Sequence, residues 1–148
     1  MVSKLFIKCD NKQIESLYTC LLDQTNLHTV NLVFIENITI NPNQTKTIDL
    51  GIKCNMKEIH QTISSKNNLF DKLDLFVCIP YWVVPNNFLG KTTLLPVCSP
   101  MIVEPNSDET IKVVLYNYGA VPVEIKKGHQ YFKIACSNLQ LIDKVIIQ

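Results

Sequence analysis

The sequence predicts an all-β fold, a jelly roll or distorted β-barrel formed as a single domain by residues 1–148. Three observations support this class. Runs of isoleucine, valine, leucine and threonine recur along the chain, and most of these residue types favour strands. Apolar residues alternate within the runs, as in residues 45–54, where Ile48, Leu50 and Ile52 point to one face. Turn-forming residues separate the runs, as in folds that join many short strands.

The pattern is clearest in residues 111–134. Two apolar runs, residues 111–116 and 121–125, flank Asn117-Tyr118-Gly119-Ala120. Asparagine and glycine tolerate positive φ angles, so this linker predicts a hairpin turn. Gly128 fits a second turn, after which residues 131–136 supply a third strand, giving an antiparallel meander. The core residues predicted in this segment are Val113, Leu115, Val123, Ile125 and Ile134.

The remaining elements follow from the same criteria. Residues 12–24 carry leucine and isoleucine at helical spacing, which predicts a short helix. Residues 55–74 are polar and predict a loop with a turn of helix near residues 56–63. Two prolines bound an aromatic stretch within residues 80–87, which predicts an irregular corner. The other predicted strands are residues 4–9, 30–35, 37–40, 45–54, 75–79, 92–97 and 101–103, with an edge strand or arm at residues 139–142 and 145–147.

Composition limits the classes of partner. The formal net charge is +1, and basic residues do not cluster with aromatic ones along the chain, so the sequence gives no support for a nucleic-acid surface. All 14 cationic residues are lysines, which lack the bidentate geometry that arginine offers to phosphate groups. No apolar run approaches the ~20 residues of a membrane span, so we expect no membrane partner.

Six cysteines are scattered along the chain without a C-x-x-C pair. Four of them lie inside apolar, strand-like runs: Cys9, Cys54, Cys78 and Cys136. An even count permits three disulfides, but the first residues lack the apolar segment of a secretory signal. We therefore expect reduced cysteines that act as small hydrophobic residues, and an intracellular location in the cytoplasm or nucleus.

Several segments resemble the dUTPase family. VVLYNYG at residues 113–119 and VEIKKGHQYFKI at residues 123–134 are similar to the family's V-V-L-F-N strand and the K-K-G turn that leads into G-D-R-I-A-Q. ITINP at residues 38–42 resembles its T-I-x-P segment. The resemblance extends loosely over residues 5–145 and implies a dUTPase-like jelly roll. It also implies a homotrimer, because dUTPases pack three such domains around a threefold axis with active sites between subunits. The alternative is a monomer whose C-terminal arm folds back on its own barrel.

The first two dUTPase motifs are altered at the matching positions. Asn31 occupies the place of an aspartate that reaches Mg²⁺ through water, and a neutral amide weakens the organisation of a metal. Tyr81 and Trp82 fall on the phosphate-binding P-R-S-G segment, where the family uses serine and glycine. These two aromatic residues are better explained as core or interface residues.

The later motifs are altered too. Glu104 occupies the place of the water-activating aspartate, and Ser107 that of the tyrosine that packs under deoxyribose. Gly128 is kept, but the arginine after it in the family is Gln130 here. Each lost charge-assisted contact is worth roughly 1.5–3 kcal/mol, which is far more than one remaining base offsets. The resemblance therefore implies an inactive relative with no catalytic, metal-binding or cofactor-binding residues and no cofactor.

Other chemistries have little support. His28, His60 and His129 are far apart and lack cysteine or histidine partners at ligand spacing, which argues against zinc. Gly90-Lys91-Thr92 matches the last residues of a P-loop motif, but the first glycine of that motif is missing, so a phosphate-binding P-loop is not supported.

The function predicted first is that of a catalytically inactive, dUTPase-like protein that serves as a structural or protein-interaction module. Large DNA viruses keep proteins of this kind, so the resemblance also implies that the protein is a virion component and that it binds a second protein. The alternative is a divergent dUTP-type pyrophosphatase, with Glu104 as the base and Lys91 and Lys112 at the phosphates. A nucleotide-binding regulator without turnover is the third hypothesis.

Overall fold

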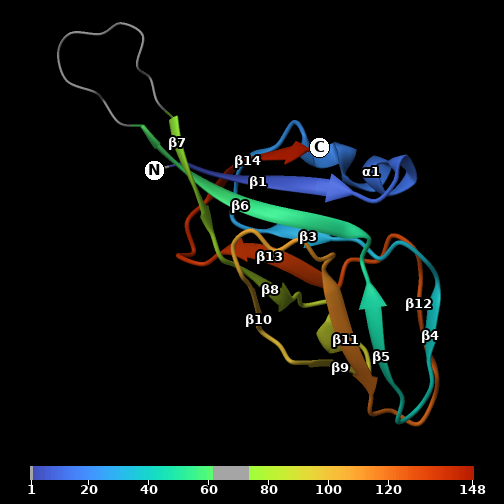
Figure 1. The fold of residues 1–148 in the computed structure, drawn as a ribbon. Helices are drawn as coiled ribbons and strands as arrows, with labels where there is room; N and C mark the ends of the chain where they lie inside the picture. Colours follow the sequence, from blue (N-terminus) through green and yellow to red (C-terminus); the bar gives the residue numbers. More distant parts are fainter. Residues whose placement is uncertain (1, 62–73) are drawn as a thin grey trace, which may run out of the picture.

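Strands dominate the computed structural model, which describes residues 2–61 and 74–148 (Figure 1). The chain is an all-β protein, as predicted. These ranges contain fourteen strands, one α-helix and two short 3-10 helices. In chain order the elements are β1 (Val2–Cys9), α1 (Lys12–Tyr18), η1 (Thr19–Leu21), β2 (Thr25–Leu27), β3 (Val30–Leu32), β4 (Ile38–Ile40), β5 (Thr45–Asp49), β6 (Ile52–Gln61), β7 (Asp74–Ile79), β8 (Tyr81–Pro85), η2 (Leu89–Lys91), β9 (Leu94–Val97), β10 (Met101–Val103), β11 (Lys112–Asn117), β12 (Val123–Ile125), β13 (Phe132–Cys136) and β14 (Ile142–Ile147).

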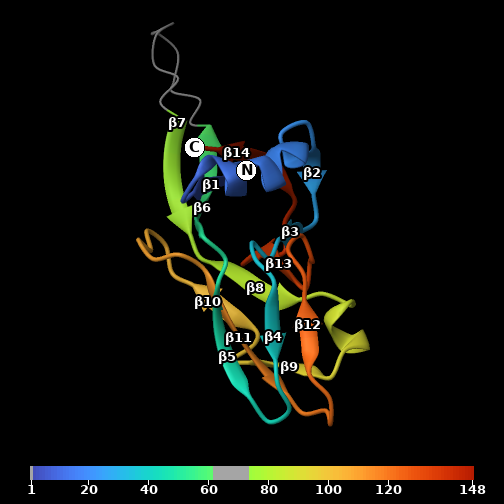
Figure 2. The ribbon, with the colours of Figure 1, turned by 90° about the vertical axis from the view of Figure 1, so that its right-hand side faces the viewer.

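The strands are arranged in sheets of five, four, three and two strands. Their orders are β2-β14-β1-β6-β7, β10-β8-β13-β3, β5-β11-β9 and β12-β4. The five-stranded sheet forms one end of the molecule, and the three-stranded and two-stranded sheets form the other (Figures 1 and 2). The four-stranded sheet lies between them and shares the core with both ends.

Strand β1 organises the five-stranded sheet. It pairs antiparallel with β6 along its whole length, from Val2 opposite Ile59 to Cys9 opposite Ile52. On its other side it pairs parallel with β14. Burial alternates along β1, because Ser3, Leu5 and Ile7 face the core while the residues between them are partly or fully exposed.

A contiguous core connects the sheets. Of the core residues predicted in residues 111–134, Val113, Leu115, Ile125 and Ile134 are buried and Val123 packs half-buried against them. Helix α1 closes one side of this core, and its N-terminus is capped by the Asn11 side chain, which accepts a hydrogen bond from the Ile14 amide at 3.0 Å. Tyr18, at the end of α1, is fully buried, and its hydroxyl accepts a hydrogen bond from the Val33 amide at 3.0 Å.

The predicted hairpin in residues 111–134 is wrong, although its strands exist. β11 pairs with β5 and β9, β12 pairs with β4, and β13 pairs with β3 and β8, so the three strands belong to three different sheets. Neither Asn117 nor Gly119 has a positive φ angle. The buried Asn117 instead ends β11, and its side chain hydrogen-bonds Ile40 of β4, Thr93 just before β9 and Val121 before β12.

Four local predictions also need correction, in whole or in part. Residues 45–54 form two strands, because Gly51, with a φ of 69°, breaks the run between β5 and β6. The helical turn predicted near residues 56–63 is strand β6 as far as Gln61, and the rest of that prediction lies outside the described residues. The corner predicted at residues 80–87 contains strand β8, whose Tyr81 and Val83 face the core while Trp82 faces outward. The predicted helix of residues 12–24 is confirmed only as α1 and η1.

The C-terminal apolar segment forms neither an edge strand nor a free arm. β14 lies between β1 and β2 in the five-stranded sheet, and Ile142 and Val145 are fully buried there. The chain's own core therefore explains Ile142 and Val145, whereas Leu139 and Leu141, which precede β14, are 80 % and 42 % exposed. The sequence could not show this, because an arm and an inner strand have the same alternating pattern.

Candidate functional site

The four-stranded sheet carries three of the six positions that the sequence singled out, Asn31, Tyr81 and Trp82, and Glu104 directly follows one of its strands. Tyr81 starts β8 and points inward, and its hydroxyl donates a hydrogen bond to the Cys54 carbonyl at 3.2 Å. Burial raises the pKa of the Tyr81 phenol far above its ordinary value. A neutral phenol at this depth is a core residue, one of the two roles predicted for it.

Trp82 points to the opposite face of the same sheet. Its indole N–H donates to the Ser137 carbonyl at 3.4 Å, and its neighbours across the ladder are Ile102 on β10 and Ala135 on β13. Ile102 is 52 % exposed. Trp82 is therefore part of a partly exposed apolar surface.

Asn31 and Glu104 lie at opposite edges of this sheet. Asn31 is exposed on the edge strand β3, opposite Lys133 of β13. Glu104 directly follows β10, the other edge strand. Three strand spacings of 4.7–4.9 Å, or about 14 Å, separate these edges. Asn31 is level with Val84 of β8, whereas Glu104 lies beyond the pairing of Val103 with Tyr81, so the two positions are also offset along the strands.

Gly128 belongs to the turn before β13. Its φ angle is 93°, and its amide donates to the Phe34 carbonyl at 2.8 Å. A second backbone hydrogen bond joins the same segments, because the carbonyl of the next residue, His129, accepts from the Phe34 amide at 3.0 Å. Gly128 thus serves the chain reversal that the sequence predicted for it.

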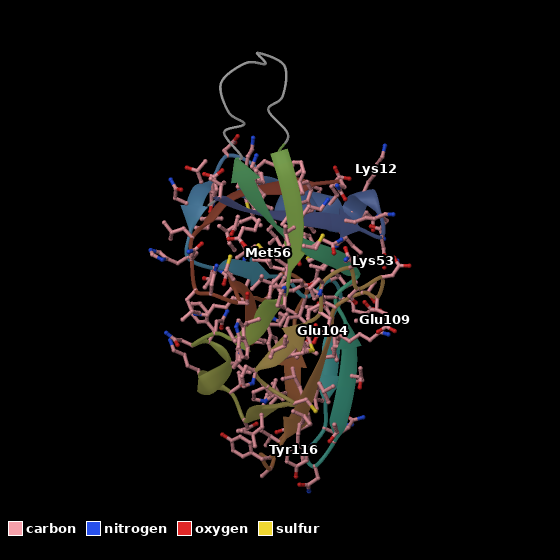
Figure 3. The ribbon with its side chains drawn as sticks, turned by 60° about the vertical axis from the view of Figure 1, so that its left-hand side comes forward. Lys12, Lys53, Met56, Glu104, Glu109 and Tyr116 are labelled. Atoms are coloured by element: carbon pink, nitrogen blue, oxygen red, sulfur yellow. The ribbon has the colours of Figure 1, made fainter. Side chains whose placement is uncertain are left out.

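Glu104 and Ser107 are brought together in a shallow hollow of about 260 Å³. Glu109 and Lys112 also line it, so it holds two carboxylates and one ammonium group. Figure 3 shows Glu104 and Glu109 on one side of the molecule, with Lys53 above them. Lys53 is joined to this loop by an exposed ion pair to Asp108 with an N–O distance of 3.7 Å.

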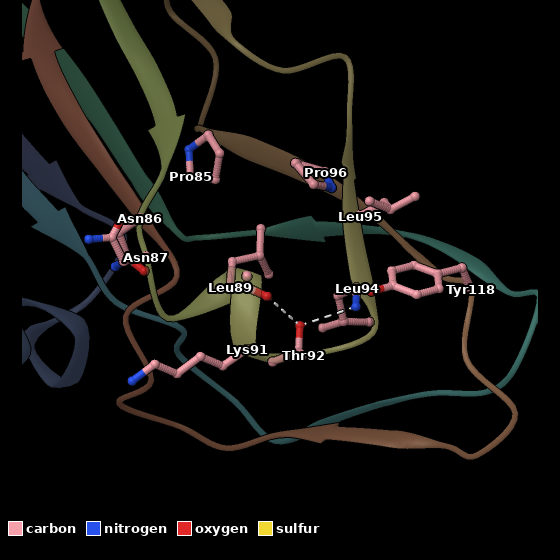
Figure 4. Close-up of a pocket in the computed structure, with 11 residues that line it drawn as sticks. Pro85, Asn86, Asn87, Leu89, Lys91, Thr92, Leu94, Leu95, Pro96 and Tyr118 are labelled. Carbon is pink, nitrogen blue, oxygen red and sulfur yellow. Dashed lines mark hydrogen bonds between the residues drawn. The ribbon is translucent and has the colours of Figure 1, made fainter.

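A second hollow, of about 660 Å³, was not predicted from the sequence (Figure 4). It lies between the end of β8, η2 and the edge strand β9. Leu89 and Leu94 form a buried floor, while Leu95 and Tyr118 stand half-exposed at the rim. Lys91, proposed above as a phosphate ligand, lines this hollow and not the one that holds Glu104 and Lys112.

The polar groups of this second hollow are largely occupied by local structure. The Thr92 hydroxyl donates to the Leu89 carbonyl at 2.7 Å and accepts from the Leu94 amide at 3.1 Å. The Asn86 side chain accepts from the Phe88 amide at 3.0 Å and also contacts the Gln130 carbonyl. Among the residues that line the hollow, Lys91 and Tyr118 are the ionisable ones, so its surface offers apolar contact with a single positive charge.

The cysteines and histidines form no further site in the described residues. Cys54 is buried among core residues, and burial raises the pKa of its thiol. His129 contacts the Tyr131 hydroxyl through Nδ1 at 3.2 Å. Across residues 2–61 and 74–148, no three histidine, cysteine or acidic side chains lie close enough together to hold a metal ion. The same ranges contain no helix that is long and apolar enough to cross a membrane.

Comparisons with known proteins give limited similarity. The chain matches no known family and no curated protein. Among solved structures it is similar to a native dUTPase of EIAV, with a TM-score of 0.48 and 18 % sequence identity over 71 % of this chain and 70 % of that one. A similarity of this size assigns neither an activity nor a site to this chain.

Proposed function

We propose that this protein is a protein-interaction module on an all-β framework and that it does not hydrolyse dUTP. The observation that carries the proposal is the 660 Å³ hollow beside β9. Leu95 and Tyr118 at its rim are 49 % and 53 % exposed, above a floor of buried leucines. Exposed apolar side chains around a hollow are typical of sites that bind a hydrophobic anchor of another protein.

The chemistry of the hollow suggests what such a partner would offer. Pro85 and Pro96 line two of its walls, and Pro96 interrupts the hydrogen-bonding capacity of the edge strand β9. Recognition would therefore use side chains more than added strand pairing. The Lys91 ammonium lies 5.4 Å from the Phe88 ring centroid, at the edge of the hollow. A partner with an apolar anchor next to a carboxylate would match this arrangement.

A matched pair of variants tests the role of the hollow. Leu95→Arg should reduce binding of the partner at least tenfold, because a charged side chain would replace apolar contact at the rim. Leu141→Arg, at a leucine that is 42 % exposed and does not line the hollow, is the control. Affinity capture from the source cells with quantitative mass spectrometry measures the difference. If both variants retain the same proteins in the same amounts, the hollow is not the binding site.

The proposed lack of dUTP hydrolysis is supported by the burial of Tyr81, which replaces a phosphate-binding segment of the family by a core residue. We expect no pyrophosphate release above background from dUTP with Mg²⁺. Steady release that disappears in Glu104→Gln would instead support the alternative, a divergent pyrophosphatase. The observation that favours this alternative is the shared hollow of Glu104, Glu109 and Lys112.

Three further features remain predictions: a homotrimer and incorporation into a virion, which the resemblance implies, and an intracellular location, which the cysteines indicate. Strand β14 needs no neighbouring subunit to cover it, because Ile142 and Val145 are buried within its own chain.

A further inference from the structure

Strand pairing in the five-stranded sheet aligns lysines that are far apart in sequence. Lys4 of β1 is directly opposite Lys57 of β6 and also opposite Lys144 of β14. The three occupy one row across the sheet. Leu5, whose neighbours in the same two ladders are Met56 and Val145, is fully buried, so the adjacent lysine row lies on the outer face. Figure 3 shows Met56 beneath this sheet, toward the other sheets.

A second basic row lies further along the same face. Lys8 of β1 is opposite Lys53 of β6, four residues beyond the first row on each strand and therefore about 13 Å away. Between the two rows lie Phe6 and Ile146, which are half-buried, and Asn55. The outer face thus carries a half-exposed apolar row between two lysine rows.

This arrangement is electrostatically unfavourable for the free protein. Like charges directly opposite each other on neighbouring strands destabilise a sheet. Lys57 gains some compensation from the Phe6 ring, whose centroid is 4.5 Å from Nζ. Lys53 has its exposed partner Asp108, and Asp143 lies at the irregularity in the β1–β14 pairing. The outward positions of Val2–Cys9 and Ile52–Ile59, as far as their side chains are described, carry four lysines and no carboxylate.

We infer that this outer face binds single-stranded nucleic acid, with phosphates along the lysine rows and bases over the Phe6 row. Lysines supply the sequence-independent attraction to phosphates, and an aromatic side chain offers a stacking partner for any base. This surface has no local signal in the sequence, because its lysines come from three separate segments. The strand register places them side by side around an aromatic residue.

The apolar row distinguishes a single strand from other polyanions. A duplex has its bases paired and stacked inside, so it would place phosphates against Phe6 and Ile146. On a membrane, the lysine ammonium groups would bind the lipid head groups. Because lysine side chains are longer than the half-buried Phe6 and Ile146 side chains, this apolar row would stay at the level of the head groups, where burying its surface contributes little binding free energy. A single strand offers phosphates and unstacked bases together, which matches both kinds of row.

Fluorescence anisotropy with a labelled oligothymidine of about 16 nucleotides tests the inference on the full chain. The triple variant Lys4→Gln, Lys57→Gln and Lys144→Gln should bind at least tenfold more weakly than the native protein. A plot of the logarithm of its binding constant against the logarithm of the salt concentration should have a slope that is shallower by about 2, because each neutralised phosphate contributes about 0.7 to the slope. Because the substitutions relieve repulsion, its melting temperature should be unchanged or higher, which separates lost binding from lost folding.

The control variant Lys12→Gln, Lys126→Gln and Lys127→Gln removes the same charge from exposed lysines elsewhere and should bind like the native protein. Phe6→Leu should weaken binding several-fold without changing the salt dependence, because it removes stacking and no charge. Equal losses in the two triple variants would overturn the inference, since net charge alone would explain them. Tighter binding to a duplex, or binding only to phosphatidylserine vesicles, would overturn it as well.

Discussion

Replacement of Asn117 by alanine is expected to lower the free energy of unfolding by about 3–5 kcal/mol. Asn117 is fully buried at the end of β11, and its amide satisfies four partners. Nδ2 donates to the carbonyls of Ile40 and Val121, both at 2.9 Å. Oδ1 accepts from the Gly119 amide at 2.9 Å and from the Thr93 hydroxyl at 2.8 Å. Alanine would leave these groups without their partner at a site that water reaches poorly.

Thermal or urea unfolding measures this effect, and at about 2–4 °C per kcal/mol the melting temperature should fall by roughly 10 °C. Thr93→Val removes one of the four bonds and should cost about 1 kcal/mol. Asn31→Ala, at an exposed asparagine on β3, should stay within about 0.5 kcal/mol of the native protein. A loss for Asn117→Ala as small as that for Asn31→Ala would show that these hydrogen bonds do not hold the sheets together.

The role of Asn117 also explains why the hairpin was predicted wrongly. Local sequence identified β11, β12 and β13, because apolar alternation and Gly128 are local signals. Pairing depends on partners far away in the chain. The Asn117 side chain is hydrogen-bonded to Ile40 and Thr93, and no pattern within residues 111–125 indicates those contacts. An asparagine between two apolar runs has the same local appearance in a hairpin turn and in a buried crossover between sheets.

The candidate sites were predictable to different degrees for the same reason. Tyr81 and Trp82 were assigned to the core or an interface, and the structure places one in the core and the other on a partly exposed face. The hollow beside β9 needs Tyr118 next to residues 85–96, and this proximity arises because β9 pairs with β11. The lysine rows need the register of β14 on β1, which fixes the partner of Lys4. Both surfaces follow from tertiary pairing and have no local signature.

Gly51 is the second position where a small change should have a large effect. Gly51→Ala is expected to cost about 2–4 kcal/mol of unfolding free energy. Its φ of 69° is in the left-handed region, where a residue with a Cβ loses about 1–2 kcal/mol. A Cβ there would lie 2.7 Å from Ile14 Cδ1 and 2.9 Å from Ile35 Cδ1, so both side chains would have to move. The strain would act where the chain passes from β5 to β6 and where α1 meets the core.

Two other glycines separate the contributions of backbone strain and crowding in the same unfolding measurement. Gly128→Ala keeps the positive φ, here 93°, but its Cβ would meet nothing within 4 Å, so strain alone should cost about 1–2 kcal/mol. Gly90→Ala has neither an unfavourable φ nor a contact within 4 Å and should be neutral or slightly stabilising. The expected order of stability is therefore Gly90→Ala, then Gly128→Ala, then Gly51→Ala. Equal losses at Gly51 and Gly128 would mean that Ile14 and Ile35 adjust without cost and that conformation alone requires glycine between β5 and β6.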